Sequence, residues 1–173
     1  MADLFIIGQI IKGVQFTEQK LSCQWSISTG IGWSHCNGDR EGQSSFDQPA
    51  DKYYDGFIFS LPMEVHFQTI TMSQWPEIQL QLFTQDKKKQ KQLIAQGSCF
   101  VPFQKGNHEL KVQCWKHCKD KAYIEGSLGT PQDGSITGGP APNQITEPSG
   151  YVLIELNVCT NGFAERGIGA SNE

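Results

Sequence analysis

Apolar and polar residues alternate along much of the chain with a period of two. The first clear stretch, residues 21–28, places a Ser or Gln after each of four apolar residues, Leu21, Cys23, Trp25 and Ile27. This alternation is typical of a β-strand with one face in the core and the other in water. It recurs at 63–68, 77–83, 93–101, 107–114 and 152–158, and no window shows the spacing of an amphipathic helix.

The run from Leu4 to Ile11 differs, because it is apolar at nearly every position. Only Gly8 and Gln9 interrupt it, as expected of a central strand that is covered on both faces. The polar segment after 21–28 is predicted to hold two short strands, at 43–47 and 57–60. Together these segments predict an all-β fold, a single antiparallel β-sandwich of about eight strands.

Two segments rich in Gly and Pro, Gly30–Gly56 and Lys116–Gly150, are longer than ordinary turns. Within the second we expect a mobile loop near 127–149. A chain of 173 residues suits one well-buried core. We therefore expect one domain at 1–162, with the loop inside it, and a flexible C-terminal tail at 163–173.

The charge of the chain gives no reason to expect binding to nucleic acid. It carries 14 basic and 18 acidic residues, a formal net charge of −4, and only two of the basic residues are Arg. Asp3 stands where a signal peptide needs positive charge, and no apolar run reaches the length of a membrane span, about 18 residues. We expect a cytoplasmic protein whose Cys residues are thiols.

No residue pattern predicts catalysis. The chain has no Gly-x-Ser-x-Gly turn and no glycine-rich phosphate loop, and its four His have no orienting partner at a recognisable spacing. The best metal candidate is Cys114, His117 and Cys118, with His108 nearby. However, Cys114 shares the apolar face of its strand, which favours a buried side chain over a zinc ligand. We therefore predict no enzyme, no metal and no cofactor.

The turn after 77–83 is basic. It supplies only one carboxylate, Asp86, and is followed by four lysines that oppose a calcium site, Lys87, Lys88, Lys89 and Lys91. Such a cluster attracts anionic lipid headgroups at about 1 kcal/mol per residue. A solvated turn that protects a sheet edge from aggregation has the same composition, so both interpretations stay open.

Four side chains are candidates for contact with a protein partner. Trp33 lies on the polar Gly-rich loop and Trp115 follows a predicted strand, and Trp at a rim often marks a protein contact. Each also suits packing in the core or the anchoring of a loop. The charged pair Arg40 and Glu41, on the same loop as Trp33, completes the set.

Several segments form a signature through their order and spacing. The opening block contains Gly8-Gln9-Ile10, Cys23–Ile27, Thr29–Trp33 and Arg40–Gln43. The later segments are Trp75–Asp86, Gly97–Pro102 and the final strand at 152–158. In this arrangement the chain resembles the B9 (B-nine) domain family from Leu4 to Asn161, and Lys116–Gly150 shows least of the family pattern.

The resemblance implies a non-catalytic, C2-like sandwich at the cilium basal body and transition zone. Members of the family assemble with other B9-domain proteins in the Meckel-syndrome and tectonic complex. By resemblance, the chain would be a scaffold component required for cilium assembly and for the gate that restricts membrane-protein diffusion into the cilium. The alternative is a peripheral, calcium-independent module that binds anionic phospholipid through its lysine-rich loop.

Overall fold

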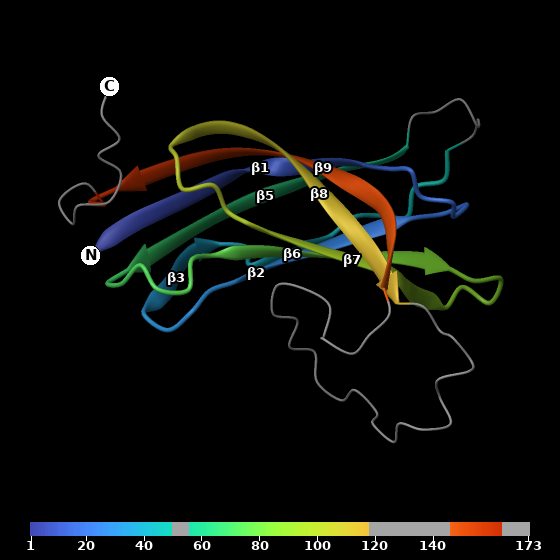
Figure 1. Ribbon diagram of the computed structural model, residues 1–173, viewed down its shortest axis with the longest axis horizontal. Helices are drawn as coiled ribbons and strands as arrows, with labels where there is room; N and C mark the ends of the chain where they lie inside the picture. Colours follow the sequence, from blue (N-terminus) through green and yellow to red (C-terminus); the bar gives the residue numbers. More distant parts are fainter. Residues whose placement is uncertain (50–55, 118–145, 164–173) are drawn as a thin grey trace, which may run out of the picture.

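The alternating segments fold into β-strands. The computed structural model describes residues 1–49, 56–117 and 146–163, and in these it contains nine strands and no helix (Figure 1). The strands are β1 (Ala2–Val14), β2 (Ser22–Ser28), β3 (Trp33–Gly38), β4 (Glu41–Gln43), β5 (Phe57–Thr69), β6 (Glu77–Gln85), β7 (Lys91–Phe100), β8 (Gly106–His117) and β9 (Thr146–Asn161). The described residues thus offer no helix that could cross a membrane.

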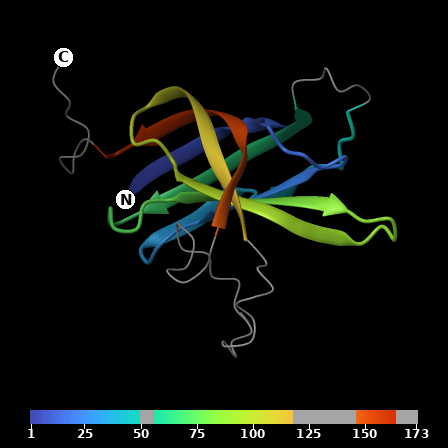
Figure 2. The same cartoon turned by 45° about the vertical axis from the view of Figure 1, so that its right-hand side comes forward.

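All nine strands belong to one antiparallel sheet that folds back on itself. The strand order is β3-β5-β1-β9-β8-β7-β6-β2-β4. In Figure 1, β1, β5 and β9 lie above β2, β6 and β7, and Figure 2 shows β8 and β9 crossing from the first layer towards the second. The predicted all-β, C2-like sandwich is therefore confirmed.

The two edge strands of the sheet, β3 and β4, follow each other in the chain. Asp39 and Arg40 alone join them. The amide of Asp39 donates to the carbonyl of Glu64 in β5 at 3.0 Å, and the amide of Ile27 in β2 donates to the carbonyl of Arg40 at 2.8 Å. This corner is hydrogen-bonded to both layers, and we call it, together with β3 and β4, the edge corner.

The inward faces form the core, as the alternation predicts. Trp25 and Phe67, from opposite layers, are the largest fully buried side chains, at 1% and 0% exposure. Burying one Leu, Ile, Met or Phe side chain stabilises a fold by roughly 1.5–3 kcal/mol. The other side chains exposed by less than 2% are Leu4, Ile6, Ile10, Leu21, Met63, Ile78, Leu80, Leu82, Ile154 and Leu156.

Strand β1 is central, as predicted, but only one of its faces is covered. It pairs with β5 and β9, and its side chains Phe5 and Ile7 are 36% and 48% exposed. The Phe5 ring stacks on His66 with 4.1 Å between ring centroids, and His66 Nε2 lies 2.9 Å from Asp3 Oδ1. The prediction that both faces are buried was wrong, because a two-layer sandwich leaves the outer face of each layer in solvent.

A β-bulge decides which residues of β7 face inward. The pairing of β6 with β7 passes from Leu82↔Ala95 to Phe83↔Leu93 and leaves Ile94 without a partner in the ladder. One extra residue reverses the faces of the residues beyond it. Ala95 is therefore buried, whereas Leu93, which the alternation places on the same face, is 40% exposed.

The strands in the first Gly-rich segment differ from those predicted. The strand expected at 43–47 does not form as predicted: β4 covers Glu41–Gln43 and shares only Gln43 with it, and a single bridge joins Leu21 to Asp47. The segments 57–60 and 63–68 form one continuous strand, β5, which pairs with both β1 and β3.

The C-terminal limits also differ. Strand β9 begins at Thr146, so residues 146–149, expected in the mobile loop, pair with β8. Phe163, expected in the flexible tail, is 5% exposed and belongs to the core. The remainder of the expected loop, 127–145, and of the tail, 164–173, lies outside the described residues.

We expect Gly8→Ala to destabilise the fold strongly. A Cβ at Gly8 would lie 2.0 Å from the carbonyl oxygen of Glu155 and 2.9 Å from the Cα of Leu156. Because both are backbone atoms of β9, the two strands would have to move apart, and we expect a loss of about 3 kcal/mol in the free energy of unfolding by urea. Gln9→Ala, on the exposed face, is the control and should change it by less than about 0.5 kcal/mol. Equal values for the two variants would contradict the close approach.

Candidate functional site

Trp33, a partner-contact candidate, is buried rather than displayed. Its side chain is 9% exposed, and its ring lies edge-on to Trp75 with 5.2 Å between centroids. Its Nε1 donates to the carbonyl of Ser73 at 3.1 Å. Because Ser73 lies on the loop between β5 and β6, Trp33 ties the β2–β3 loop to that loop. Its position suits the anchoring interpretation better than direct contact.

Trp75 extends the same packing to a third loop. Its Nε1 donates to the carbonyl of Val101 at 2.8 Å, and its ring stacks on Phe103 with 4.5 Å between centroids. Phe163 packs edge-on against the same ring at 5.8 Å. We call Trp33, Trp75, Phe103 and Phe163 the aromatic cluster. The alternation gave no sign of Phe103 or Phe163, since both lie beyond the end of a strand.

Arg40 and Glu41 lie at the edge corner. The Arg40 guanidinium is 3.4 Å from the carbonyl oxygen of Ile27 and 6.0 Å from the centre of the Phe67 ring. Its position over the buried Phe67 covers the seam where the two edges of the sheet meet. Glu41 is exposed and faces Ser26 across the β2–β4 pair.

The edge corner also presents open strand edges. In β3 every residue after Trp33 is exposed, and among the described residues no further strand pairs with the outer side of β3 or β4. Strands of this kind carry unpaired backbone amide and carbonyl groups that can accept another strand. The corner thus combines hydrogen-bonding edges with one exposed cation, Arg40, and two exposed carboxylates, Asp39 and Glu41.

The four lysines of the predicted lipid contact do not behave alike. Lys87, Lys88 and Lys89 are exposed on the β6–β7 turn, where Asp86 Oδ1 accepts hydrogen bonds from the amides of Lys88 and Gln90 at 2.8 Å each. Among the described residues no ion pair involves them. We call these three residues the lysine turn.

Lys91 is held on the sheet surface instead. Its Nζ donates to Gln24 Oε1 at 3.1 Å and to Gln43 Oε1 at 3.0 Å, and it lies 3.7 Å from the centre of the Phe83 ring. These contacts join β7 to β2 and β4. The cation is therefore less available to a ligand than those of the lysine turn.

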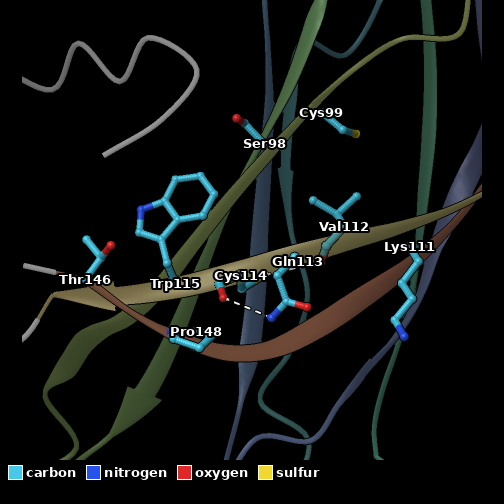
Figure 3. Close-up of a pocket in the computed structure, with 9 residues that line it drawn as sticks. All are labelled: Ser98, Cys99, Lys111, Val112, Gln113, Cys114, Trp115, Thr146 and Pro148. Carbon is cyan, nitrogen blue, oxygen red and sulfur yellow. Dashed lines mark hydrogen bonds between the residues drawn. The ribbon is translucent and has the colours of Figure 1, made fainter. Parts of the chain in front are cut away.

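Trp115 lies on the wall of a cleft where β7 and β8 separate (Figure 3). The two strands pair only at Gln96↔Trp115 and Gly97↔Cys114, and beyond these positions they diverge. The cleft has a volume of about 450 Å³ and is mostly apolar, with the Ser98 and Thr146 hydroxyls as polar groups near the ring. Trp115 is half-buried there, so it remains a candidate for contact.

The predicted metal candidate is not assembled in the part of the chain that the structure describes. Cys114 is buried, and burial, with a further effect of Cys99, raises the pKa of its thiol to about 12. His108 Nε2 lies 2.8 Å from the carbonyl oxygen of Gln104 in the β7–β8 loop. Cys118 and the side chain of His117 lie outside the described residues. Among the described side chains no three His, Cys, Asp or Glu residues are grouped as metal ligands would be.

Fold and surface define a C2-like β-sandwich whose notable features are packing clusters, open edges and charged turns. The model of the B9-C2 family, described as ciliary basal body-associated B9 protein, matches residues 4–159, so the chain belongs to this family. This membership gives the chain a ciliary basal body-associated role and a location at the cilium and basal body. The family is not a known enzyme family.

Curated relatives agree over nearly the whole chain. B9 domain-containing protein 2 of Mus musculus is 39% identical over 174 residues, which cover 98% of this chain and 93% of the relative. The protein of the same name from Danio rerio is 37% identical over 185 residues, covering 97% and 99%. That of Bos taurus is 32% identical over 175 residues, again covering 97% and 99%.

Burial should divide the cysteines by reactivity. Burial raises the pKa of Cys23, and it raises those of Cys99 and Cys114 to about 12, so these thiols stay protonated at pH 8 and titrate only near the alkaline limit. Cys36 and Cys159 are exposed. Peptide mass spectrometry after brief iodoacetamide treatment at pH 8 should find the exposed pair modified at least about 100-fold faster than Cys23, Cys99 and Cys114.

The control for this difference is the unfolded chain in urea, where all the cysteines should react at similar rates. Fast modification of Cys114 in the folded protein at pH 8 would contradict its burial.

Proposed function

We propose that this protein is a non-catalytic scaffold component of the transition-zone complex of Meckel-syndrome and tectonic proteins. In this role it binds other B9-domain proteins, is required for cilium assembly and contributes to the gate that restricts membrane-protein diffusion into the cilium. Family membership over residues 4–159 supports the proposal. It is also supported by the surface of the described residues, where strand edges and exposed charges are found without a catalytic grouping.

The edge corner is the main structural support for the proposal. Exposed strand edges bind partner proteins by adding a strand from the partner, with backbone hydrogen bonds supplying affinity and neighbouring side chains supplying specificity. A partner B9 sandwich would offer strands of its own for such pairing. Arg40 and Glu41 stand beside the open edges and would select the partner by charge.

The other two partner-contact candidates fit less directly. Trp33 is buried and would act by holding the β2–β3 loop that leads into the edge corner. Trp115 lies on the cleft between β7 and β8, away from the corner in the strand order, and would belong to a separate contact.

We expect the charge swap Arg40→Glu with Glu41→Lys to weaken partner binding. The net charge is unchanged, but each charge would then face a group of the same sign on the partner. We expect the amount of B9-domain protein that co-purifies at physiological salt to fall at least about tenfold, which corresponds to a loss of about 1.4 kcal/mol in binding free energy. Co-purification of the full-length proteins, quantified by mass spectrometry, measures the effect.

The matched control is the swap Glu109→Lys with Lys87→Glu, which also keeps the net charge. Both residues are exposed, and they lie on β8 and the β6–β7 turn rather than at the edge corner. It should leave co-purification unchanged. An equal loss in both variants would show that the effect is not specific to the edge corner.

The second candidate function is calcium-independent binding to anionic phospholipid through the lysine turn. Its supporting observation is the exposure of Lys87, Lys88 and Lys89 on a turn that Asp86 holds in shape. Each cation near an anionic surface contributes about 1 kcal/mol, and salt screens the attraction.

Changing Lys87, Lys88 and Lys89 to Gln should reduce co-sedimentation with phosphatidylserine vesicles at least about tenfold at low salt. Lys91→Gln is the matched control and should have a smaller effect, because that cation already binds Gln24 and Gln43. Unchanged sedimentation of the triple variant would remove the lysine turn from lipid binding.

A further inference from the structure

Three loops at one end of the sandwich each expose a large apolar side chain. Ile31 on the β2–β3 loop is 89% exposed, Ile70 on the β5–β6 loop is 63% exposed, and Phe103 on the β7–β8 loop is 62% exposed. The three loops lie at the left-hand end of the molecule in Figure 1. We call these side chains the apolar tips.

The apolar tips belong to one connected surface. The amide of Ile31 donates to Gln74 Oε1 at 3.0 Å, which joins the first loop to the second. Trp33 and Trp75 of the aromatic cluster pack beneath the loops, and Phe103 stacks directly on Trp75. The amide of Val101 donates to the carbonyl of Pro76 at 3.0 Å and fixes the third loop against the second.

The charge of this end is unusual for the chain. None of the 18 acidic residues lies in 28–34, 69–76 or 101–106. Lys105 is the single formally charged residue in these three segments. In a protein of net charge −4, three loops without carboxylates are compatible with a negatively charged surface that the remainder of the molecule would repel.

The polar groups of the aromatic cluster are already satisfied. The Nε1 atoms of Trp33 and Trp75 both donate to backbone carbonyls of the neighbouring loops. Moving this end into an apolar medium therefore leaves neither donor without a partner, which is otherwise a large cost.

We propose that the apolar tips insert into the interfacial region of an anionic membrane, with Lys105 at the headgroups. The occupant is a lipid surface because the three tips stand on separate loops that carry no carboxylate, and a fluid bilayer accommodates them without a shaped counterpart. This inference goes beyond the scaffold function and requires no B9-domain partner.

The surface is distinct from the lysine turn. Strand β6 runs from the β5–β6 loop to the lysine turn, and β7 runs back from that turn to the β7–β8 loop. The two surfaces therefore lie at opposite ends of a nine-residue strand, about 30 Å apart. A flat membrane at one end cannot touch the other.

Flotation with vesicles of phosphatidylcholine and phosphatidylserine tests the proposal on the full chain. The variant Ile31→Gln, Ile70→Gln, Phe103→Gln should lose at least about tenfold in vesicle-bound protein. The unmodified protein should keep most of its binding at about 0.5 M salt, where screening removes attraction that is purely electrostatic. The matched control, Ile58→Gln with Leu93→Gln, removes side chains that are 54% and 40% exposed elsewhere and should bind as the unmodified protein does.

A second measurement does not depend on the triple variant folding. Vesicles with bromine on the upper acyl chain should quench the tryptophan fluorescence of the otherwise unmodified protein carrying Trp115→Phe, because Trp33 and Trp75 lie directly beneath the tips. Absence of quenching in bound protein would overturn the proposal.

The remaining outcomes separate this inference from the scaffold function. Unchanged flotation of the folded triple variant overturns the insertion. If the variant instead loses co-purification of B9-domain proteins while the unmodified chain ignores vesicles, the tips are a protein contact and the lipid proposal fails. If the unmodified chain floats through its tips but co-purifies no B9-domain protein, the scaffold function fails and the insertion stands.

Discussion

The two-residue connection between the edge strands β3 and β4 constrains how the whole sheet folds. β3 and β4 stand at opposite ends of a nine-stranded sheet, yet only Asp39 and Arg40 separate them in the chain. Two intervening residues span at most about 11 Å, close to the separation of two packed sheet layers, about 10 Å. The sheet must therefore fold over until its edges meet, which gives every strand an inner and an outer face. Trp25 and Phe67, from opposite layers, fill the space between the two faces.

This constraint explains which parts of the fold the sequence could predict. Within one strand, alternation reports which residues share a face, and the inner faces of β2, β5, β6 and β9 agree with it. Alternation does not report whether the second face is covered. Phe5 and Ile7 looked buried because they are apolar, but the sheet curls away from that side. Leu93 was misplaced because a bulge at Ile94 arises from pairing with another strand.

In the candidate sites, too, the sequence predicted features that depend on a short segment but not those that depend on contacts between distant segments. The basic character of the lysine turn is local and could be read from the sequence. The engagement of Lys91 depends on Gln24 and Gln43, which sheet order brings beside it. Trp33, on a polar loop, suited either a partner contact or the anchoring of the loop, and its burial comes from Trp75 and Ser73, forty or more residues away. No pattern in the sequence marked the exposed Phe103, because its role depends on the Trp75 ring on which it stacks.

The positions of the two proposed contacts are compatible with each other. The three loops that carry the apolar tips lie at one end of the strands, whereas the open edges of β3 and β4 run along the sides of the sheet. A protein standing end-on in a membrane would keep those edges parallel to the membrane normal and open to neighbours in the same layer. Strand addition between such modules would extend an assembly across the membrane surface without displacing the tips. The aromatic cluster contains both Phe103, one of the apolar tips, and Trp33, the first residue of β3, so one packed group supports both proposed contacts.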